Sequence, residues 1–236
     1  MSEEAKKLLL RLKKEKKVDK QIDLIRKLEP YNQEEMVNVV LLKHLERKDL
    51  DTLRLEILSS LNPHDDHVIK PLAALVTNKN ELQVVREKAI ALLGQNKGNK
   101  ALGALLSSYK KVKDLTILDN ITFALTSFED KRVEKPIIKA LANDELRLQT
   151  LTGLAKNENL LLSSLQLIKA VMALEVTKSL EGIHYTKILN TLGDEFGYTN
   201  KEDIVKAIKD KSIEDKIRDY AKKQKDIDKV LRKVQQ

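Results

Sequence analysis

The chain of 236 residues contains no cysteine and no tryptophan, and only seven glycines and four prolines. The lack of cysteine excludes disulfide bonds, thiolate zinc sites and cysteine nucleophiles, and it fits a reducing, cytoplasmic location. The scarcity of glycine and proline disfavours a fold rich in β-strands and tight turns. Aromatic residues make up 3% and hydrophobic residues 42% of the chain, so aliphatic side chains must build the core.

Charged residues make up 34% of the chain, with lysine, glutamate and leucine prominent, a composition typical of helical surfaces. We therefore expect an all-α fold. The most apolar stretch, residues 160–176, is interrupted by Ser163, Ser164, Gln166, Lys169 and Glu175. A membrane-spanning helix needs about 20 predominantly apolar residues. The stretch thus predicts a buried helix, and no membrane span is expected.

A pair consisting of an aliphatic residue and an arginine recurs along the chain. Leu53–Arg54, Val85–Arg86 and Leu146–Arg147 keep the pair, and Leu118–Asp119 holds the same slot with the opposite charge, in steps of 32, 33 and 28 residues. A fixed period of this length indicates a repeated structural unit, and the apolar spacing within it predicts two helices. The four expected helix pairs are 52–61 with 67–76, 81–94 with 99–111, 115–127 with 131–142, and 145–155 with 160–174.

Further helices are expected on both sides of these four units. A weaker copy spans 18–28 and 33–47, where Asn32 and Glu35 form the pattern of a capping box, and an end helix precedes it at 3–17. After residue 176 the repeat period is lost, although the sequence remains typical of helices. We predict a repeat domain over residues 1–176, with its best copies at 50–174, and a helical C-terminal extension or cap over 177–236.

The last predicted helix has a narrow apolar seam with alternating steps of four and three residues. Such spacing is typical of a coiled coil, but it also suits a helix that covers the open end of a helical stack. The sequence thus leaves two interpretations, a cap or a homodimer through residues 213–234. The seam consists of Ile213, Ile217, Tyr220, Gln224, Ile227, Leu231 and Val234.

Two segments carry a family resemblance. Residues 84–94, Val-Val-Arg-Glu-Lys-Ala-Ile-Ala-Leu-Leu-Gly, resemble the first helix of a short bacterial or archaeal HEAT repeat, and residues 68–75 resemble its second helix. The resemblance implies a right-handed, armadillo-type α-solenoid with first helices on the convex side and second helices on the concave side. Asp119 in place of arginine, and Thr122 and Thr150 in place of alanine, depart from the pattern. The resemblance implies no particular activity.

Two groups of residues are candidates for specific roles. The repeated arginines, Arg54, Arg86 and Arg147, would form a ladder that either bridges neighbouring repeats or binds phosphates. The run from His64 to His67 holds two histidines around two aspartates, a weak pattern for a divalent metal ion. In the alternative interpretation, Asp65 or Asp66 caps the helix that follows. We expect no metal and no cofactor.

The net charge of +8 is unevenly distributed. The four second helices carry nine basic residues against one acid, whereas the first helices are nearly neutral. A basic concave face would attract acidic peptides or nucleic-acid backbones. In the alternative interpretation, the lysines lie at helix ends only because basic residues are favoured at helix C-termini. The candidate partner-binding residues are Lys70, Lys100, Lys110, Lys111, Lys131, Lys135 and Lys139.

The sequence favours a protein without catalytic activity. It contains no phosphate-binding glycine loop, no catalytic triad and no nucleophile motif. We expect a scaffold that binds an acidic protein on its concave face, with nucleic-acid binding through phosphates as the alternative. An enzyme resembling HEAT-like DNA glycosylases is a third hypothesis, disfavoured because few aromatic residues are available to line its cleft.

Overall fold

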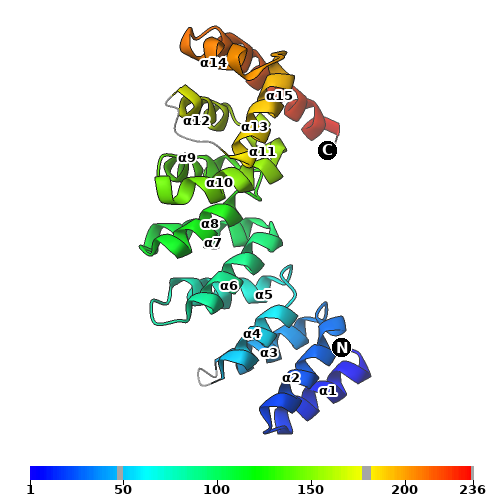
Figure 1. Cartoon of the computed structure of the whole chain (residues 1–236). Helices are drawn as coiled ribbons and strands as arrows, with labels where there is room; N and C mark the ends of the chain where they lie inside the picture. Colours follow the sequence, from blue (N-terminus) through cyan, green and yellow to red (C-terminus); the bar gives the residue numbers. More distant parts are fainter. Residues whose placement is uncertain (47–49, 177–181, 235–236) are drawn as a thin grey trace. The chain divides into compact units, whose positions relative to one another are not determined.

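The computed structural model describes residues 1–46, 50–176 and 182–234, with the side chains of residue 176 and of residues 228–234 left aside. Within these residues every regular element is a helix and none is a strand, so the all-α prediction is confirmed. The chain divides into two compact units, unit 1 (Met1–Ala124) and unit 2 (Leu125–Gln236), which are described separately (Figure 1). The division lies within the predicted repeats, away from the expected domain boundary at 176/177.

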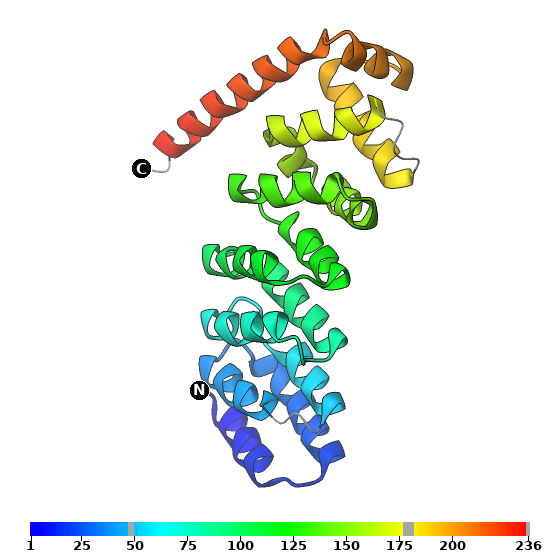
Figure 2. The same cartoon turned by 90° about the vertical axis from the view of Figure 1, so that its left-hand side faces the viewer.

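Unit 1 consists of helices packed in two adjacent rows (Figure 2). Helices α2, α4 and α6 pack one against the next in the first row, and α3, α5 and α7 do so in the second row. Aliphatic side chains such as Leu53, Val68, Val85 and Leu93 are buried between the rows. The helices are α1 (Glu3–Lys14), α2 (Val18–Leu28), η1 (Glu29–Tyr31), α3 (Glu35–Leu45), α4 (Asp51–Ser60), α5 (Asp66–Thr77), α6 (Gln83–Asn96), α7 (Asn99–Lys111) and α8 (Leu115–Leu125), whose last residue belongs to unit 2.

The ladder arginines of unit 1 cap the ends of second-row helices. Arg54 Nε in α4 donates to the carbonyl of Leu45, the last residue of α3, at 3.1 Å. Arg86 Nε in α6 donates to Val76 O, near the end of α5, at 3.0 Å. Carbonyls in the last turn of a helix lack partners within the helix, and a cation placed there is stabilising. The aliphatic residue of each pair enters the core while the arginine fixes the neighbouring helix.

The same arginines also reach forward along the first row. Arg54 Nη1 and Nη2 each lie 2.7 Å from a carboxylate oxygen of Glu81, which precedes α6, and both side chains are almost fully buried. Arg86 Nη1 lies 3.6 Å from Asp114, which precedes α8. Each arginine therefore joins the preceding second-row helix to a later segment, the one before α6 for Arg54 and the one before α8 for Arg86.

Asp119 interrupts this ladder in α8. Its Oδ1 atom is buried and has no hydrogen-bond partner in the part of the chain that the structure describes. Burial raises the pKa of the Asp119 carboxyl because it disfavours the charged form. Helix α8 therefore lacks the arginine contacts that α4 and α6 make.

Unit 2 repeats the two-row packing with modified contacts. Helix α13 packs on α10, and α14 packs on α12, so the arrangement continues after the sequence rhythm has faded. Arg147 Nε donates to Leu141 O at the end of α9, and the buried Tyr185 donates to Val171 O in α12 at 3.4 Å. The helices are η2 (Lys131–Val133), α9 (Glu134–Leu141), α10 (Asp144–Lys156), α11 (Glu158–Ser163), α12 (Leu165–Val176), α13 (Ile183–Phe196), α14 (Lys201–Lys209) and α15 (Ile213–Val234).

Two local predictions are wrong. The single helix expected over 160–174 is broken at Ser164, which has an extended backbone and whose Oγ accepts from Leu167 N at the start of α12. The capping box expected from Asn32 and Glu35 does not form, because Glu34 is the N-cap residue of α3 and makes no side-chain cap. Asn32 Nδ2 instead donates to Ser60 O at the end of α4.

Helix α15 covers the other C-terminal helices with its first half. Ile213 and Ile217 are buried, and α15 contacts α12, α13 and α14. Lys216 Nζ donates to Phe196 O at the end of α13, and further along the helix Ile227 is 50% exposed. The start of the predicted seam therefore packs within the chain, and a homodimer would have to use the seam from Gln224 onward. The side chains of its last two residues lie outside the described set.

Gly153 in α10 lies close to Thr126, the residue that follows α8. A Cβ there would collide with Thr126 Oγ1 and lie 2.9 Å from Thr126 Cβ, and Thr126 is buried. We expect Gly153→Ala to lower the free energy of unfolding by about 1–3 kcal/mol, because the added methyl group overpacks the contact. This loss should outweigh the gain from the higher helix propensity of alanine. Urea unfolding measures this change. The control Gly103→Ala, in an open position of α7, should raise the free energy of unfolding by about 0.5–1 kcal/mol. Equal changes in the two variants would contradict the close contact between Gly153 and Thr126.

Candidate functional site

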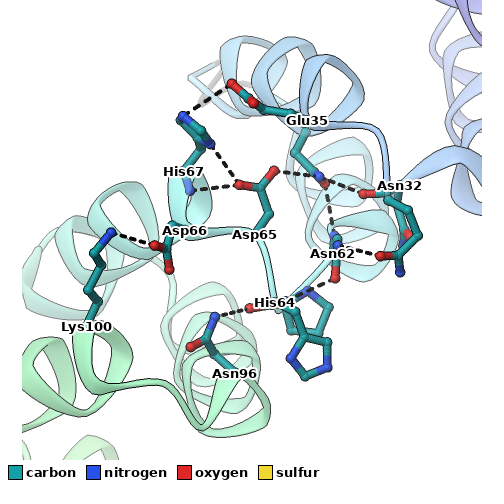
Figure 3. A network of polar contacts seen from close by, with 12 residues as sticks. Asn32, Glu35, Asn62, His64, Asp65, Asp66, His67, Asn96 and Lys100 are labelled. Atoms are coloured by element: carbon teal, nitrogen blue, oxygen red, sulfur yellow. Dashed lines mark hydrogen bonds and ion pairs between the residues drawn. The ribbon is translucent and has the colours of Figure 1, made fainter. Parts of the chain in front are cut away.

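Each carboxylate on the second-row helices of unit 1 contacts a neighbouring basic side chain. Helices α3, α5 and α7 contain two acidic residues, Glu35 and Asp66. Glu35 Oε1 lies 3.3 Å from His67 Nε2, and Asp66 Oδ2 accepts from Lys100 Nζ (Figure 3). Lys100 therefore compensates the charge of Asp66, and His67 compensates the charge of Glu35 when its imidazole is protonated.

Most lysines of the same three helices are left without a counter-charge. Lys100 is paired with Asp66, whereas Lys43, Lys70, Lys110 and Lys111 are exposed and have no carboxylate partner among the described residues. The helices α2, α4, α6 and α8 carry six cationic residues and six carboxylates, so they are balanced. Among the helices of the two rows, the excess of positive charge thus lies on the second row. Helix α1 carries a further excess, with five basic residues against two acidic ones.

A groove between α3 and α5 lies on this row. It has a volume of about 510 Å³, within the usual range for ligand clefts of about 300–1,000 Å³. The buried pair of Arg54 and Glu81 lies at the groove, and Lys43 and the half-exposed His67 line it as well. Glu46 and Asn78 are the other polar residues of the lining. The rest of the wall is apolar and consists of Val39, Leu42, Leu45, Pro71, Ala74 and Leu75.

A polar network fixes the turn at the start of α5. Asp65 is the N-cap residue, and its Oδ1 accepts from His67 N and from His67 Nδ1, both at 2.9 Å (Figure 3). Asn38 Nδ2 in α3 donates to the other oxygen of Asp65 at 2.9 Å, and Asn38 Oδ1 accepts from Asn62 N. The network joins α3 to α5 at one end of the groove.

The histidines of the weak metal pattern are not brought together. His64 and His67 point to opposite sides of the turn (Figure 3), and His64 N donates to Asn62 Oδ1. Among the described residues, no three His, Cys, Asp or Glu side chains are placed to hold a metal ion. Asp65 serves as a helix cap, which is the alternative that the sequence offered.

His67 is expected to titrate above the ordinary histidine pKa of about 6.5. The hydrogen bond to Asp65 raises its pKa first, and the charge of Glu35 raises it further. Only the protonated imidazole donates to both carboxylates, so this contribution to stability is present at low pH and is lost as pH rises through the raised pKa. In an NMR titration Glu35→Gln should lower the pKa of His67, whereas the exposed control Glu29→Gln should leave it unchanged. An unchanged value in the first variant would contradict the Glu35 contact.

The candidate lysines of the third predicted helix pair, 115–127 with 131–142, lie in unit 2. Lys131 in η2 and Lys135 and Lys139 in α9 are exposed, and none has an ion-pair partner among the described residues. The neighbouring Arg132 is paired with Asp130. Since Lys70 and Lys135 belong to different units, each unit carries its own set of candidate lysines.

Lys43 and the groove were not predicted. Lys43 lies in the second helix of the weaker copy, 33–47, so the same charge count applied to that copy would have found it. The groove has no comparable signal, because it depends on which side chains of α3 and α5 face each other.

Comparison with protein-family models gives no match, and a search of curated proteins finds no significant relative. The HEAT resemblance therefore stays a prediction. Among the helices in the described residues, none has the length and apolar character needed to cross a membrane.

Proposed function

We propose that the protein is a HEAT-like α-solenoid scaffold that binds an acidic protein segment on its second-row helices and catalyses no reaction. The observation that carries the proposal is the state of the charges on α3, α5 and α7. Both carboxylates are paired within the chain, while Lys43, Lys70, Lys110 and Lys111 are unpaired. An acidic ligand would neutralise charges that the fold itself leaves uncompensated.

The packing of unit 1 supports the solenoid part of the proposal. Helices of each row contact the next helix of the same row, which is the neighbour-to-neighbour packing of repeat proteins. In such a stack the second row would line the concave side, so the unpaired lysines would face a partner held there.

A protein ligand is favoured over nucleic acid by the groove beside the lysines. Its wall is mainly apolar, which suits peptide side chains and offers little to a phosphate backbone. The five tyrosines and three phenylalanines of the chain provide few stacking groups for bases. Nucleic acid is the second candidate because the same lysines can neutralise phosphates.

A competition experiment separates the two ligands. A library of acidic peptides of equal net charge and mixed composition is screened for binding to the full chain, at an ionic strength of about 0.15 M. The best peptides are expected to displace labelled single-stranded and duplex DNA of matched charge. DNA that outcompetes every peptide would favour the nucleic-acid function. If neither class binds, the scaffold proposal is wrong.

A further inference from the structure

The groove between α3 and α5 has two features that together define a ligand. The first is an apolar wall in a cleft of about 510 Å³, formed by side chains from both helices. The second is the pair of unpaired lysines on the same two helices, Lys43 on α3 and Lys70 on α5. Neither feature serves the packing of the chain itself, because the groove is open and both lysines are exposed.

We propose that this groove is an anchor site for one bulky aliphatic side chain, leucine or isoleucine, within an acidic peptide segment. The aliphatic side chain is buried against Leu42, Pro71 and Leu75. Flanking carboxylates lie near Lys43, which lines the groove together with Glu46, and near Lys70, which precedes Pro71 in α5. This assignment rests on the proposed scaffold function and specifies its partner. Charge attracts the segment to the second row, and apolar burial fixes its register there.

A second copy of the chain does not fit the groove equally well. The chain carries a net charge of +8, and residues 1–20 and 201–236 each contain four more basic than acidic residues. The exposed part of α15 around Ile227 is also rich in lysine, with Lys222, Lys223 and Lys225 close by. Lys43 and Lys70 outnumber Glu46 at the groove, so they would repel these basic segments, whereas an acidic partner removes the repulsion.

Two peptides of equal length and net charge test the anchor. One contains a central leucine among glutamates and the other has serine at that position, and both are titrated into the full-length chain. The leucine peptide is expected to bind about tenfold more tightly, since a buried aliphatic side chain contributes at least that factor. The groove-filling variant Ala74→Trp should lose this preference and keep the affinity for the serine peptide.

Ala74 is exposed, so its replacement leaves the core intact, and Ala91→Trp at an exposed position of α6 is the matched control. The control should keep the tenfold preference. Equal binding of both peptides to the unmodified chain would overturn the anchor site while leaving the scaffold function in place. If neither peptide binds, the proposed function and the anchor site both fail.

Discussion

Replacement of Arg54 with alanine should lower the free energy of unfolding by about 3–5 kcal/mol, the usual cost of removing one partner of a buried ion pair. The guanidinium makes two 2.7 Å contacts with Glu81, and the two side chains are only 3% and 4% exposed. Its removal leaves the Glu81 carboxylate buried without its main counter-charge, and Leu45 O at the end of α3 loses its donor. Both losses act on the junction of three helices in unit 1.

Urea unfolding of Arg54→Ala measures this loss, and Arg26→Ala is the matched control. Arg26 and Glu56 form the same two-contact pair at 3.0 Å between α2 and α4, but their side chains are 61% and 22% exposed. Water screens such a pair, so the loss in the control should be several times smaller. The double variant Arg54→Met with Glu81→Leu should recover most of the stability, because it leaves no unpaired buried charge. Equal losses for Arg54→Ala and Arg26→Ala would show that burial does not set the effect.

The positions of the ladder arginines could be predicted from the sequence, but their partners could not. The spacing of Leu53–Arg54 and Val85–Arg86 fixes the helices and the side on which each arginine lies. That Arg54 contacts Leu45 O and Glu81 depends on how helices α3, α4 and α6 pack against each other. No local pattern encodes this packing, because the contacts join residues that are 9 and 27 positions apart in the sequence.

The helices themselves were largely predictable, and the exceptions have local causes. Ser164 breaks the helix expected over 160–174 because its hydroxyl caps α12 and its backbone is extended, an alternative that competes with a continuous helix. The two-row packing in unit 2 continues through α13 and α14 without the aliphatic–arginine pair. There the buried Tyr185 in α13 donates to Val171 O in the middle of α12, a contact between neighbouring helices that a search for arginine cannot find.

For the candidate site, the sequence indicated a basic second row but not which charges are available. Lys100 was grouped with the other lysines, yet it is paired with Asp66 from the neighbouring helix. Lys70, Lys110 and Lys111 are unpaired, and Lys43 joins them. Pairing between helices depends on their relative register. A count of charges along the chain therefore includes lysines that are paired, such as Lys100, and omits unpaired ones, such as Lys43.

Charge reversal at one unpaired lysine of each second-row helix should have the largest effect on binding. The variant Lys43→Glu, Lys70→Glu, Lys110→Glu replaces three attractive contacts with an acidic segment by three repulsive ones. Each exposed pair is worth about 0.2–1 kcal/mol, so loss and reversal of three should weaken binding of an acidic peptide at least about tenfold. The effect should shrink at high salt because these charges are exposed to water.

The most direct test of the account compares this variant with Lys20→Glu, Lys27→Glu, Lys88→Glu, which changes the net charge equally on the first-row helices α2 and α6. Fluorescence anisotropy of a labelled acidic peptide gives the dissociation constant for each protein, and circular dichroism confirms that both are folded. The account predicts at least about a tenfold loss for the second-row variant and a change below about threefold for the first-row variant. Equal losses for the two variants would show that overall charge, rather than the second-row helices, binds the peptide.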